Sequence, residues 1–178
     1  RDYSTAHIKR RLMHRMAIGR FETISQMQDK ILRDKSFFIS LLEDLSINVT
    51  EMFRDPEFYS SFREHVVPNL RTYPFIKIWH AGCATGEEVY SLAIILKEEN
   101  LLDRCQIYAT DFNRRVLDIA KLGIYPTQDL GKFSRNYLEA GGKGKLSDYY
   151  TLKYGSLKLD QSLSKKVVFA DHNLVTDN

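Results

Sequence analysis

The sequence contains few of the residues that mark disulfide scaffolds, metal centres or membrane spans. Its 178 residues include two cysteines, four prolines and nine glycines. Cys83 and Cys105 lie in or beside predicted buried strands, which is typical of small apolar side chains in a reducing compartment rather than of a disulfide. The five histidines show no metal-ligand spacing, and no serine–histidine–aspartate set is suggested. No apolar run approaches the roughly eighteen residues of a membrane span and no signal peptide is recognised, so we expect a cytoplasmic protein.

Length and composition indicate one globular domain with an appendage. The chain is 43% hydrophobic, which is enough to bury a core at 178 residues. Its formal net charge is +3, so the overall charge does not require a nucleic-acid partner. We expect a monomer that binds no nucleic acid and inserts into no membrane.

The chain is organised around a strand, a tight turn and a helix between residues 75 and 100. The apolar run 75–79 is bounded by Pro74 and Gly82 and predicts a buried strand. Gly82 and Gly86 then frame a turn of small residues, and apolar residues recur at helical spacing after Glu88. Because no side chain projects from either glycine, a ligand can approach the backbone and the first N–H groups of the helix. The pattern indicates a cofactor site; the alternative is a purely structural turn.

Two carboxylates narrow the class of ligand. Glu87 and Glu88 lie in the first turn of the predicted helix, where the helix dipole favours them but where they would repel a pyrophosphate. The G-x-x-x-G spacing also lacks the close first glycine pair of the dinucleotide fingerprint. We therefore expect a ligand that offers hydroxyls or a positive charge.

A second strand is predicted over Cys105–Asp111, and it ends in a carboxylate. In nucleotide-binding βαβ units an acid about twenty residues beyond the glycine turn binds ribose hydroxyls, so Asp111 is the ribose candidate. The alternative is an N-cap for the helix predicted over Arg114–Leu122, a role that Asn113 could share. The two roles of Asp111 are compatible.

Residues 1–46 are predicted to form a small helical domain. Gly19 closes the first helix, and a third helix begins near Ser36. The apolar stripe of the first helix consists of Ile8, Leu12 and Met16. The apolar positions of the second helix are Met27, Ile31 and Leu32.

The first helix is basic on its other faces. The cations singled out as a candidate partner surface are Lys9, Arg10, Arg11 and Arg15. Arg11 and Arg15 are four residues apart and are therefore neighbours on the helix. The run is either a solvated face or a docking surface for an acidic partner.

Residues 47–74 are expected to connect the helical domain to the sheet. Asp55 and Pro56 predict a helix start, with Asp55 at the cap and Pro56 in the first turn. The apolar stripe of this helix, expected to end before Pro68, consists of Phe58, Phe62 and Val66. Upstream lie three polar residues with no structural role beyond capping and turn-making, namely Asn48, Thr50 and Arg54.

Residues 75–178 predict an α/β fold with an incomplete parallel sheet. Alternating runs within 124–165 indicate a small antiparallel insertion. A third buried, parallel-type strand is expected at Val167–Ala170, followed by Asn173 and Leu174. Because three parallel strands do not complete a doubly wound sheet, we expect the chain to be part of a longer protein.

The chain resembles the CheR family, S-adenosylmethionine-dependent methyltransferases that esterify glutamates on bacterial chemoreceptors. The resemblance rests on the basic first helix, on Asn48-Val49-Thr50-Glu51-Met52-Phe53-Arg54 and on the run Trp79–Ser91 with its G-E-E-x-Y-S pattern. It continues through Ile107–Asp111, Gly123-Ile124-Tyr125 and Asn173-Leu174. Met52 stands where the family usually has Phe, a mild change in packing, and the family's next strand and its C-R-N-x-x-I-Y-F motif would follow Asn178.

The resemblance implies a Rossmann-like methyltransferase domain over 75–178 and a set of site residues. Glu88, either alone or with Glu87, would meet the amino group of the cofactor, Asp111 its ribose, and Asn173 and Leu174 its adenine. The backbone at Gly82 would face the methionyl part. Asn48, Thr50 and Arg54 would close over the methionine end, with Arg54 as the catalytic candidate that orients a carboxylate of either the substrate or the cofactor.

The resemblance also implies a partner, the cytoplasmic region of a chemoreceptor. The basic first helix, with Arg11 and Arg15 as its foremost candidates, would meet its acidic methylation region, and the antiparallel insertion would dock on a receptor tail. Two other functions stay open from the residues. One is a non-catalytic signalling module that binds S-adenosylmethionine or S-adenosylhomocysteine; the other is nucleic-acid methylation, which the missing N/D-P-P-Y/F motif and the low net charge disfavour.

Overall fold

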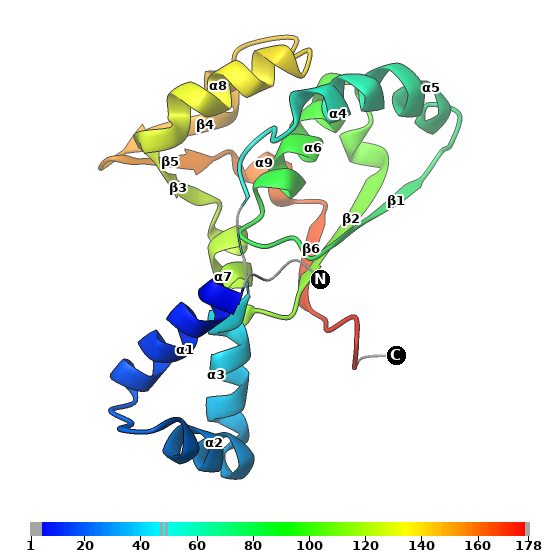
Figure 1. Ribbon diagram of the computed structural model, residues 1–178. Helices are drawn as coiled ribbons and strands as arrows, with labels where there is room; N and C mark the ends of the chain where they lie inside the picture. Colours follow the sequence, from blue (N-terminus) through cyan, green and yellow to red (C-terminus); the bar gives the residue numbers. More distant parts are fainter. Residues whose placement is uncertain (1–4, 47, 49, 177–178) are drawn as a thin grey trace. The chain divides into compact units, whose positions relative to one another are not determined.

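The computed structural model describes residues 5–46, 48 and 50–176. The chain divides into two compact units, with the boundary between residues 47 and 48. The first unit is helical and the second combines helices with two sheets (Figure 1), which confirms the predicted α/β class with a helical N-terminal part. Within the described ranges, each helix is too short or too polar to cross a bilayer.

The described part of the first unit consists of three helices, and side chains cap the starts of the second and third. The helices are α1 (Thr5–Ile18), α2 (Ile24–Arg33) and α3 (Lys35–Leu45). Thr23 and Gln26 form a capping box at the start of α2, in which each side chain accepts a hydrogen bond from the other residue's backbone N–H. The Asp34 carboxylate accepts from the N–H groups of Ser36 and Phe37, so α3 begins one residue before the predicted Ser36.

The apolar patterns of the first unit were predicted correctly in part. Met27 and Leu41 are buried, whereas Leu32, one of the apolar positions from which the second helix was predicted, is 79% exposed. Gly19 follows α1 and donates its N–H to the Arg15 carbonyl at 2.9 Å. The left-handed conformation that ends the helix is adopted by Arg20, with φ 54°.

A continuous helical segment opens the second unit. It consists of α4 (Pro56–Ser61), the π-helical turn η1 (Phe62–Val66) and α5 (Val67–Leu70). Pro56 takes the first helical position as predicted, but the Asp55 carboxylate accepts no hydrogen bond from the described N–H groups of this helix. The predicted stop before Pro68 was wrong. Pro68 has no N–H to donate to an i−4 carbonyl, and the Val67 N–H pairs with the carbonyl five residues earlier, at Phe62, so the helix widens and continues.

The predicted stripe is confirmed at Phe62, which packs partly buried against the core, but the most buried positions of this segment lie one residue further along the chain. Tyr59 and Val67 are almost completely buried, and Arg63 points inward between them, whereas Phe58 is 60% exposed. The sequence favoured Phe58 and its apolar neighbours because a cationic position is normally solvated. Arg63 is instead drawn inward by two buried carboxylates, those of Glu98 and Glu99.

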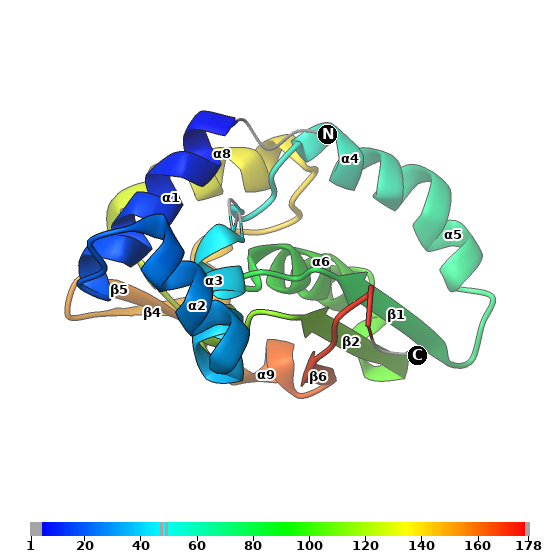
Figure 2. The same cartoon turned by 60° about the horizontal axis from the view of Figure 1, so that its bottom comes forward.

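A three-stranded parallel sheet forms the centre of the second unit. Its strands, in spatial order, are β1 (Ile76–Ala81), β2 (Cys105–Asp111) and β6 (Val167–Asp171). Helix α6 (Glu87–Glu98) connects β1 to β2 and runs alongside the sheet (Figure 2). Its side chains from Ala93 to Leu96 are completely buried, and each buried Leu or Ile contributes about 1.5–3 kcal/mol.

The parallel strands are buried on one face only, which corrects the prediction that β1 and β6 are buried strands. Trp79, Tyr108 and Val168 lie in register across the sheet and are 55%, 39% and 45% exposed. Their neighbours Ile78 and Ile107 face the core around α6. Because parallel strands usually have both faces covered, their sequences are apolar throughout and do not reveal which face is open.

The insertion predicted at 124–165 forms a second, antiparallel sheet. Helix α7 (Arg114–Leu122) leads to β3 (Ile124–Pro126), α8 (Leu130–Glu139), β4 (Tyr150–Lys153), β5 (Ser156–Leu159) and α9 (Gln161–Ser164). Short 3₁₀ turns lie at Leu102–Arg104, Thr127–Asp129 and Leu146–Tyr149. The strand order is β3-β5-β4, and Figure 1 shows this sheet apart from the parallel one, with α8 nearby.

A buried network of charges ties the insertion to α6 and η1. The Arg63 guanidinium contacts the carboxylates of Glu98 and Glu99 and donates to the Ala140 carbonyl at 3.1 Å. Both carboxylates are about 95% shielded from solvent, with side-chain exposures of 4% and 5%. The hydroxyl of Tyr137, on α8, donates to Glu98. The insertion is thus attached by ionic and polar contacts as well as by its apolar core.

Candidate functional site

Glycine stands at the two positions of the strand-to-helix turn for different physical reasons. Both have left-handed backbone conformations, with φ 79° at Gly82 and 93° at Gly86. A Cβ on Gly86 would lie 2.8 Å from the Ala120 Cβ, so Gly86 is required for packing against α7. A Cβ on Gly82 would meet no described atom within 4 Å. The backbone at Gly82 therefore borders open space that a ligand can enter.

Asp111 fastens this turn to the end of β2. One carboxylate oxygen, Oδ2, accepts from the Ala84 N–H at 2.9 Å, and the other, Oδ1, accepts from the Asn113 N–H at 2.9 Å. The N-cap of α7 is Asn113, whose side chain accepts from the Arg115 N–H at 3.1 Å. The alternative that Asp111 caps this helix is therefore wrong. Among the described residues each carboxylate oxygen of Asp111, which is 7% exposed, accepts one hydrogen bond, and this leaves a second lone pair for a ligand hydroxyl.

The two glutamates after Gly86 have different environments. Glu87 is 7% exposed and accepts from the Thr85 hydroxyl at 2.6 Å, and its burial raises the pKa of its carboxyl. The Glu88 side chain is 61% exposed, and its Oε1 lies 2.8 Å from the His80 Nδ1. The hydrogen bond with His80 lowers the pKa of the Glu88 carboxyl. Glu88 is thus an ionised acceptor that a cationic ligand can reach.

Residues 48–54, which we call the joint, include Asn48, Thr50 and Arg54. The joint packs against α6 through Phe53. The Phe53 N–H donates to the Ser91 hydroxyl at 2.9 Å, and that hydroxyl donates to the Glu87 carbonyl at 2.7 Å. These two hydrogen bonds place the joint one helical turn from the glutamates. Asn48 and Thr50 are partly buried. Sequence reasoning assigned no role to Ser91, although a serine within the otherwise apolar run Val89–Leu96 was a signal that could have indicated one.

Arg54 lies between two residues with uncommon backbone conformations. Phe53 has φ 52° and Asp55 has φ 55°, a region that costs a non-glycine residue roughly 1–3 kcal/mol. The Arg54 side chain is 56% exposed, with its Nε 3.8 Å from the Asp55 carboxylate. Strained residues of this kind concentrate at ligand sites, which favours a functional reason for the joint.

Packing compensates the strain in the joint. The ring of Phe53 is completely buried and makes edge contacts with Tyr59 and Tyr137, at 5.4 Å and 5.3 Å between centroids. Met52 is 1% exposed, and its carbonyl accepts from the Asn136 side chain at 3.2 Å. The core therefore accommodates Met52 in place of Phe.

Asn173 and Leu174 follow β6 at the same edge of the sheet. The His172 N–H donates to the Asp111 carbonyl at 3.2 Å, so the two strand ends lie side by side. The Asn173 side chain accepts from the Val175 N–H at 3.0 Å, and Leu174 is exposed. The residues gathered at the carboxyl ends of the parallel strands are Gly82, Glu87, Glu88, Asp111, Asn173 and Leu174.

The four cations of α1 separate into two pairs. Arg11 donates to carbonyls at the end of α3, with 2.8 Å to Leu45, and Arg15 pairs with the Asp44 carboxylate. Lys9 and Arg10 are exposed. Arg11 and Arg15 thus attach α1 to α3, whereas Lys9 and Arg10 face solvent.

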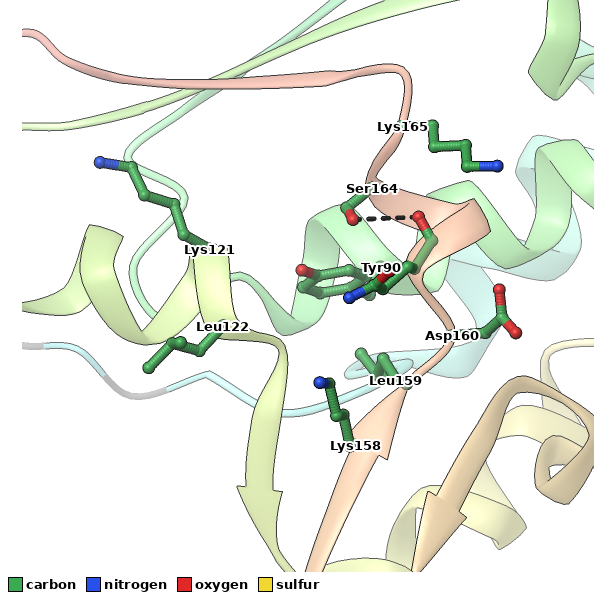
Figure 3. A pocket seen from close by; sticks show the side chains of 9 residues that line it. Tyr90, Lys121, Leu122, Lys158, Leu159, Asp160, Ser164 and Lys165 are labelled. Atoms are coloured by element: carbon green, nitrogen blue, oxygen red, sulfur yellow. Dashed lines mark hydrogen bonds between the residues drawn. The ribbon is translucent and has the colours of Figure 1, made fainter.

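A separate hollow of about 340 Å³ lies among α7, β5 and α9 (Figure 3). Tyr90, Lys121, Lys158 and Lys165 line it, and Figure 3 shows Lys121 and Lys165 pointing to different sides. None of its lining residues is a predicted cofactor residue. The part of the chain that the structure describes also holds no group of three or more histidine, cysteine, aspartate or glutamate side chains placed to bind a metal.

The chemistry at the carboxyl edge fits S-adenosylmethionine. Its ammonium and sulfonium charges suit the ionised Glu88, and its ribose hydroxyls suit the remaining lone pairs of Asp111. The open backbone at Gly82 leaves space for the chain between them. A phosphate would instead meet two carboxylates at this helix start.

Comparisons with known proteins agree with this chemistry. The family model described as "CheR methyltransferase, SAM binding domain" matches residues 48–178, so S-adenosylmethionine is the cofactor. A Pseudomonas putida protein, Cher3, whose name marks it as a candidate methyltransferase, is 51% identical over 180 residues that cover 100% of this chain and 65% of that protein. A chemotaxis protein methyltransferase of Listeria monocytogenes is 25% identical, over 98% of this chain and 64% of that protein.

A chemotaxis protein methyltransferase of Borreliella burgdorferi is 30% identical over 149 residues, covering 78% of this chain and 50% of that protein. The chain therefore spans less than two thirds of the length of these relatives. The match to the family model covers the whole second unit, including the turn and both glutamates. The chain belongs to the CheR methyltransferase family.

Proposed function

We propose that the protein transfers the methyl group of S-adenosylmethionine to glutamate side chains of chemoreceptors. The observation that carries the proposal is the cluster at the carboxyl edge, where Glu88 stays ionised, Asp111 keeps free lone pairs and Gly82 leaves the backbone open. The family membership and the chemotaxis methyltransferases among the relatives support the same reaction.

Each of the proposed cofactor residues binds or supports a different part of S-adenosylmethionine. Glu88 binds the ammonium group, and Asp111 binds the ribose while it holds the turn through Ala84. Glu87 is buried, and its hydrogen bond with Thr85 shapes the turn from inside. Asn173 and Leu174, at the end of β6, flank the adenine. Of the two glutamates, Glu88 is thus the one that contacts the ligand, and Glu87 supports it.

The reaction needs little acid–base help from the protein. S-adenosylmethionine supplies an electrophilic methyl group on a sulfonium. A solvated glutamate side chain has a pKa of about 4.3, so a substrate glutamate is already ionised near pH 7 and no general base is needed. The protein contributes by holding the carboxylate oxygen in line with the methyl group and by excluding water, which together account for several kcal/mol.

The joint supplies the groups nearest to the transfer. Arg54 orients a carboxylate through charge-assisted hydrogen bonds, while Asn48 and Thr50 close over the methionine end. The strained backbone on both sides of Arg54 fixes the direction in which its side chain leaves the joint. Arg54 is the catalytic candidate because it is the cation of this segment.

The receptor contacts the exposed side of α1. Lys9 and Arg10 offer two solvated cations to an acidic receptor segment. Arg11 and Arg15 contribute indirectly, because their contacts with α3 hold the helix in place. A charge reversal at Lys9 and Arg10 therefore tests docking, whereas one at Arg11 and Arg15 would also disturb the first unit.

The test is transfer of a labelled methyl group to a receptor's cytoplasmic fragment. We expect base-labile label, released as methanol, in the fragment and not in a variant with its methylated glutamates changed to alanine. The Glu88→Gln protein serves as the matched control for cofactor binding. Binding of S-adenosylhomocysteine without any transfer to receptor fragments would replace this proposal with the non-catalytic signalling module. Equal label in both fragments would exclude the glutamate assignment.

A further inference from the structure

The antiparallel sheet contacts the cofactor turn through the side chain of Tyr125. This residue lies at the centre of β3, opposite Leu157 of β5, and is 4% exposed. Its hydroxyl donates a 2.7 Å hydrogen bond to the carbonyl of Thr85. Thr85 directly precedes Gly86 in the turn that leads to the two glutamates. A residue of the insertion thus bonds to the backbone of the cofactor site.

The described hydrogen bonds hold the first half of the turn, residues 82–84, differently from the second half, residues 85–86. The first half is tied to β2, because the N–H groups of Gly82 and Cys83 donate to the Thr110 carbonyl and that of Ala84 to Asp111. In the second half, Gly86 donates only within the turn, to the Cys83 carbonyl at 2.9 Å. The bond from Tyr125 is the contact that connects this half to another strand.

Tyr125 is itself held in a fixed position. Its ring makes an edge contact with Tyr90, at 6.3 Å between centroids, and Gly123 allows the chain to turn into β3 with φ 60°. A Cβ at Gly123 would come 2.9 Å from the Tyr90 hydroxyl, so only glycine fits there. Burial raises the pKa of Tyr125 well above its usual value, so the hydroxyl stays a donor at neutral pH.

We propose that Tyr125 is a positioning residue, whose hydroxyl fixes the Thr85 carbonyl and thereby makes cofactor affinity depend on the position of the antiparallel sheet. The inference rests on the cofactor site of the proposed function. It gives a physical reason for the segment Gly123-Ile124-Tyr125, in which the glycine permits the entry into β3 and the tyrosine reaches the turn. A displacement of β3 would move Thr85 and, through it, the start of α6.

Tyr125→Phe in the intact protein removes the hydroxyl and keeps the ring. The matched control is Tyr90→Phe, because Tyr90 is equally buried and also donates to a backbone carbonyl, that of Ala120, at 2.8 Å. Titration calorimetry with S-adenosylhomocysteine should show affinity about five- to tenfold lower for Tyr125→Phe and changed less than about twofold for Tyr90→Phe. Both variants should unfold at similar denaturant concentrations.

Two further measurements separate positioning from general loosening. In Tyr125→Phe, the KM for S-adenosylmethionine should rise with little change in kcat, as expected when uniform binding is lost. Hydrogen exchange at residues 82–88 should also be faster in the unliganded variant than in Tyr90→Phe.

Three results would overturn the inference. Wild-type affinity in Tyr125→Phe, with binding intact in the natural protein, would remove the role of Tyr125 and leave the proposed function in place. An equal loss in both variants, or a loss of stability in Tyr125→Phe alone, would show that the hydroxyl only supports the fold. Absence of binding in the natural protein would refute the proposed function together with this inference.

Discussion

The buried charge network around Arg63 makes the clearest prediction for the stability of the second unit. Arg63→Met keeps an unbranched apolar stem but lacks the guanidinium, so it removes the three hydrogen-bonded contacts to Glu98, Glu99 and the Ala140 carbonyl. Glu98 and Glu99 would then stay buried without the guanidinium between them. The variant should therefore be markedly less stable than the natural protein.

The remaining partners set the size of the effect. Removal of one member of a buried ion pair costs about 3–5 kcal/mol. Glu99 keeps the contacts with Arg71 and Lys143, both at 2.7 Å, and Glu98 keeps the Tyr149 hydroxyl at 3.1 Å. We therefore expect a loss at the lower end of the range, about 3 kcal/mol in the free energy of unfolding.

Urea unfolding followed by tryptophan fluorescence measures this quantity. Trp79 is the one tryptophan of the sequence and lies in β1, so its signal reports the second unit. With a urea m-value of about 2 kcal/mol/M, the midpoint should fall by about 1.5 M. The control is Arg114→Met, which removes an ion pair with Asp171. The side chains of Arg114 and Asp171 are 75% and 43% exposed. Exposed pairs contribute about 0–1 kcal/mol, so this midpoint should move little.

The pH dependence provides an independent check. Burial alone would raise the pKa of Glu99, but hydrogen bonds with Lys143 and Arg63 outweigh it and lower the pKa. A lowered folded pKa means that the stabilisation is complete above the unfolded value of about 4.3 and is lost as the pH falls through the folded value. The difference between the natural protein and Arg63→Met should therefore be full at pH 7 and shrink below about pH 4. Equal midpoints for the Arg63 and Arg114 variants at pH 7 would refute this account of the network.

Three further predictions concern the proposed site. Asp111→Ala should lower the affinity for S-adenosylhomocysteine at least about tenfold in calorimetry and also destabilise the turn, because the Ala84 N–H loses its acceptor; unchanged affinity would exclude the ribose role. Arg54→Ala should reduce methyl transfer far more than the unfolding midpoint, and normal turnover would remove Arg54 from the site. Reversal of Lys9 and Arg10 to glutamate should weaken receptor methylation without changing cofactor affinity, and full activity would identify them as a solvated face.

Local sequence patterns predicted the cofactor turn because its geometry depends on neighbouring residues. Gly82 and Gly86 adopt the left-handed conformations that favour glycine, and an acid stands at the end of the following strand. The difference between Glu87 and Glu88 was beyond such reasoning. It depends on which carboxylate meets Thr85 in the interior and which meets His80 near solvent.

Long-range pairing explains where the predictions were wrong. Pro68 was expected to end a helix, but the π-helical turn absorbs its missing donor, and the inward position of Arg63 depends on two carboxylates 35 and 36 residues away. Arg11 and Arg15 are engaged with the end of α3, about thirty residues further along the chain. Periodicity alone treats every cation as solvated.

The sequence by itself determined the order of helices and strands, the glycine turn, the acid at the end of β2 and the family, because these depend on residues that are near one another in the chain. The tertiary structure alone decided which face of the parallel sheet is open, which cations are buried and which groups hold the turn. Such contacts, including the one from Tyr125 to Thr85 across 40 residues, arise only when separate elements pack together.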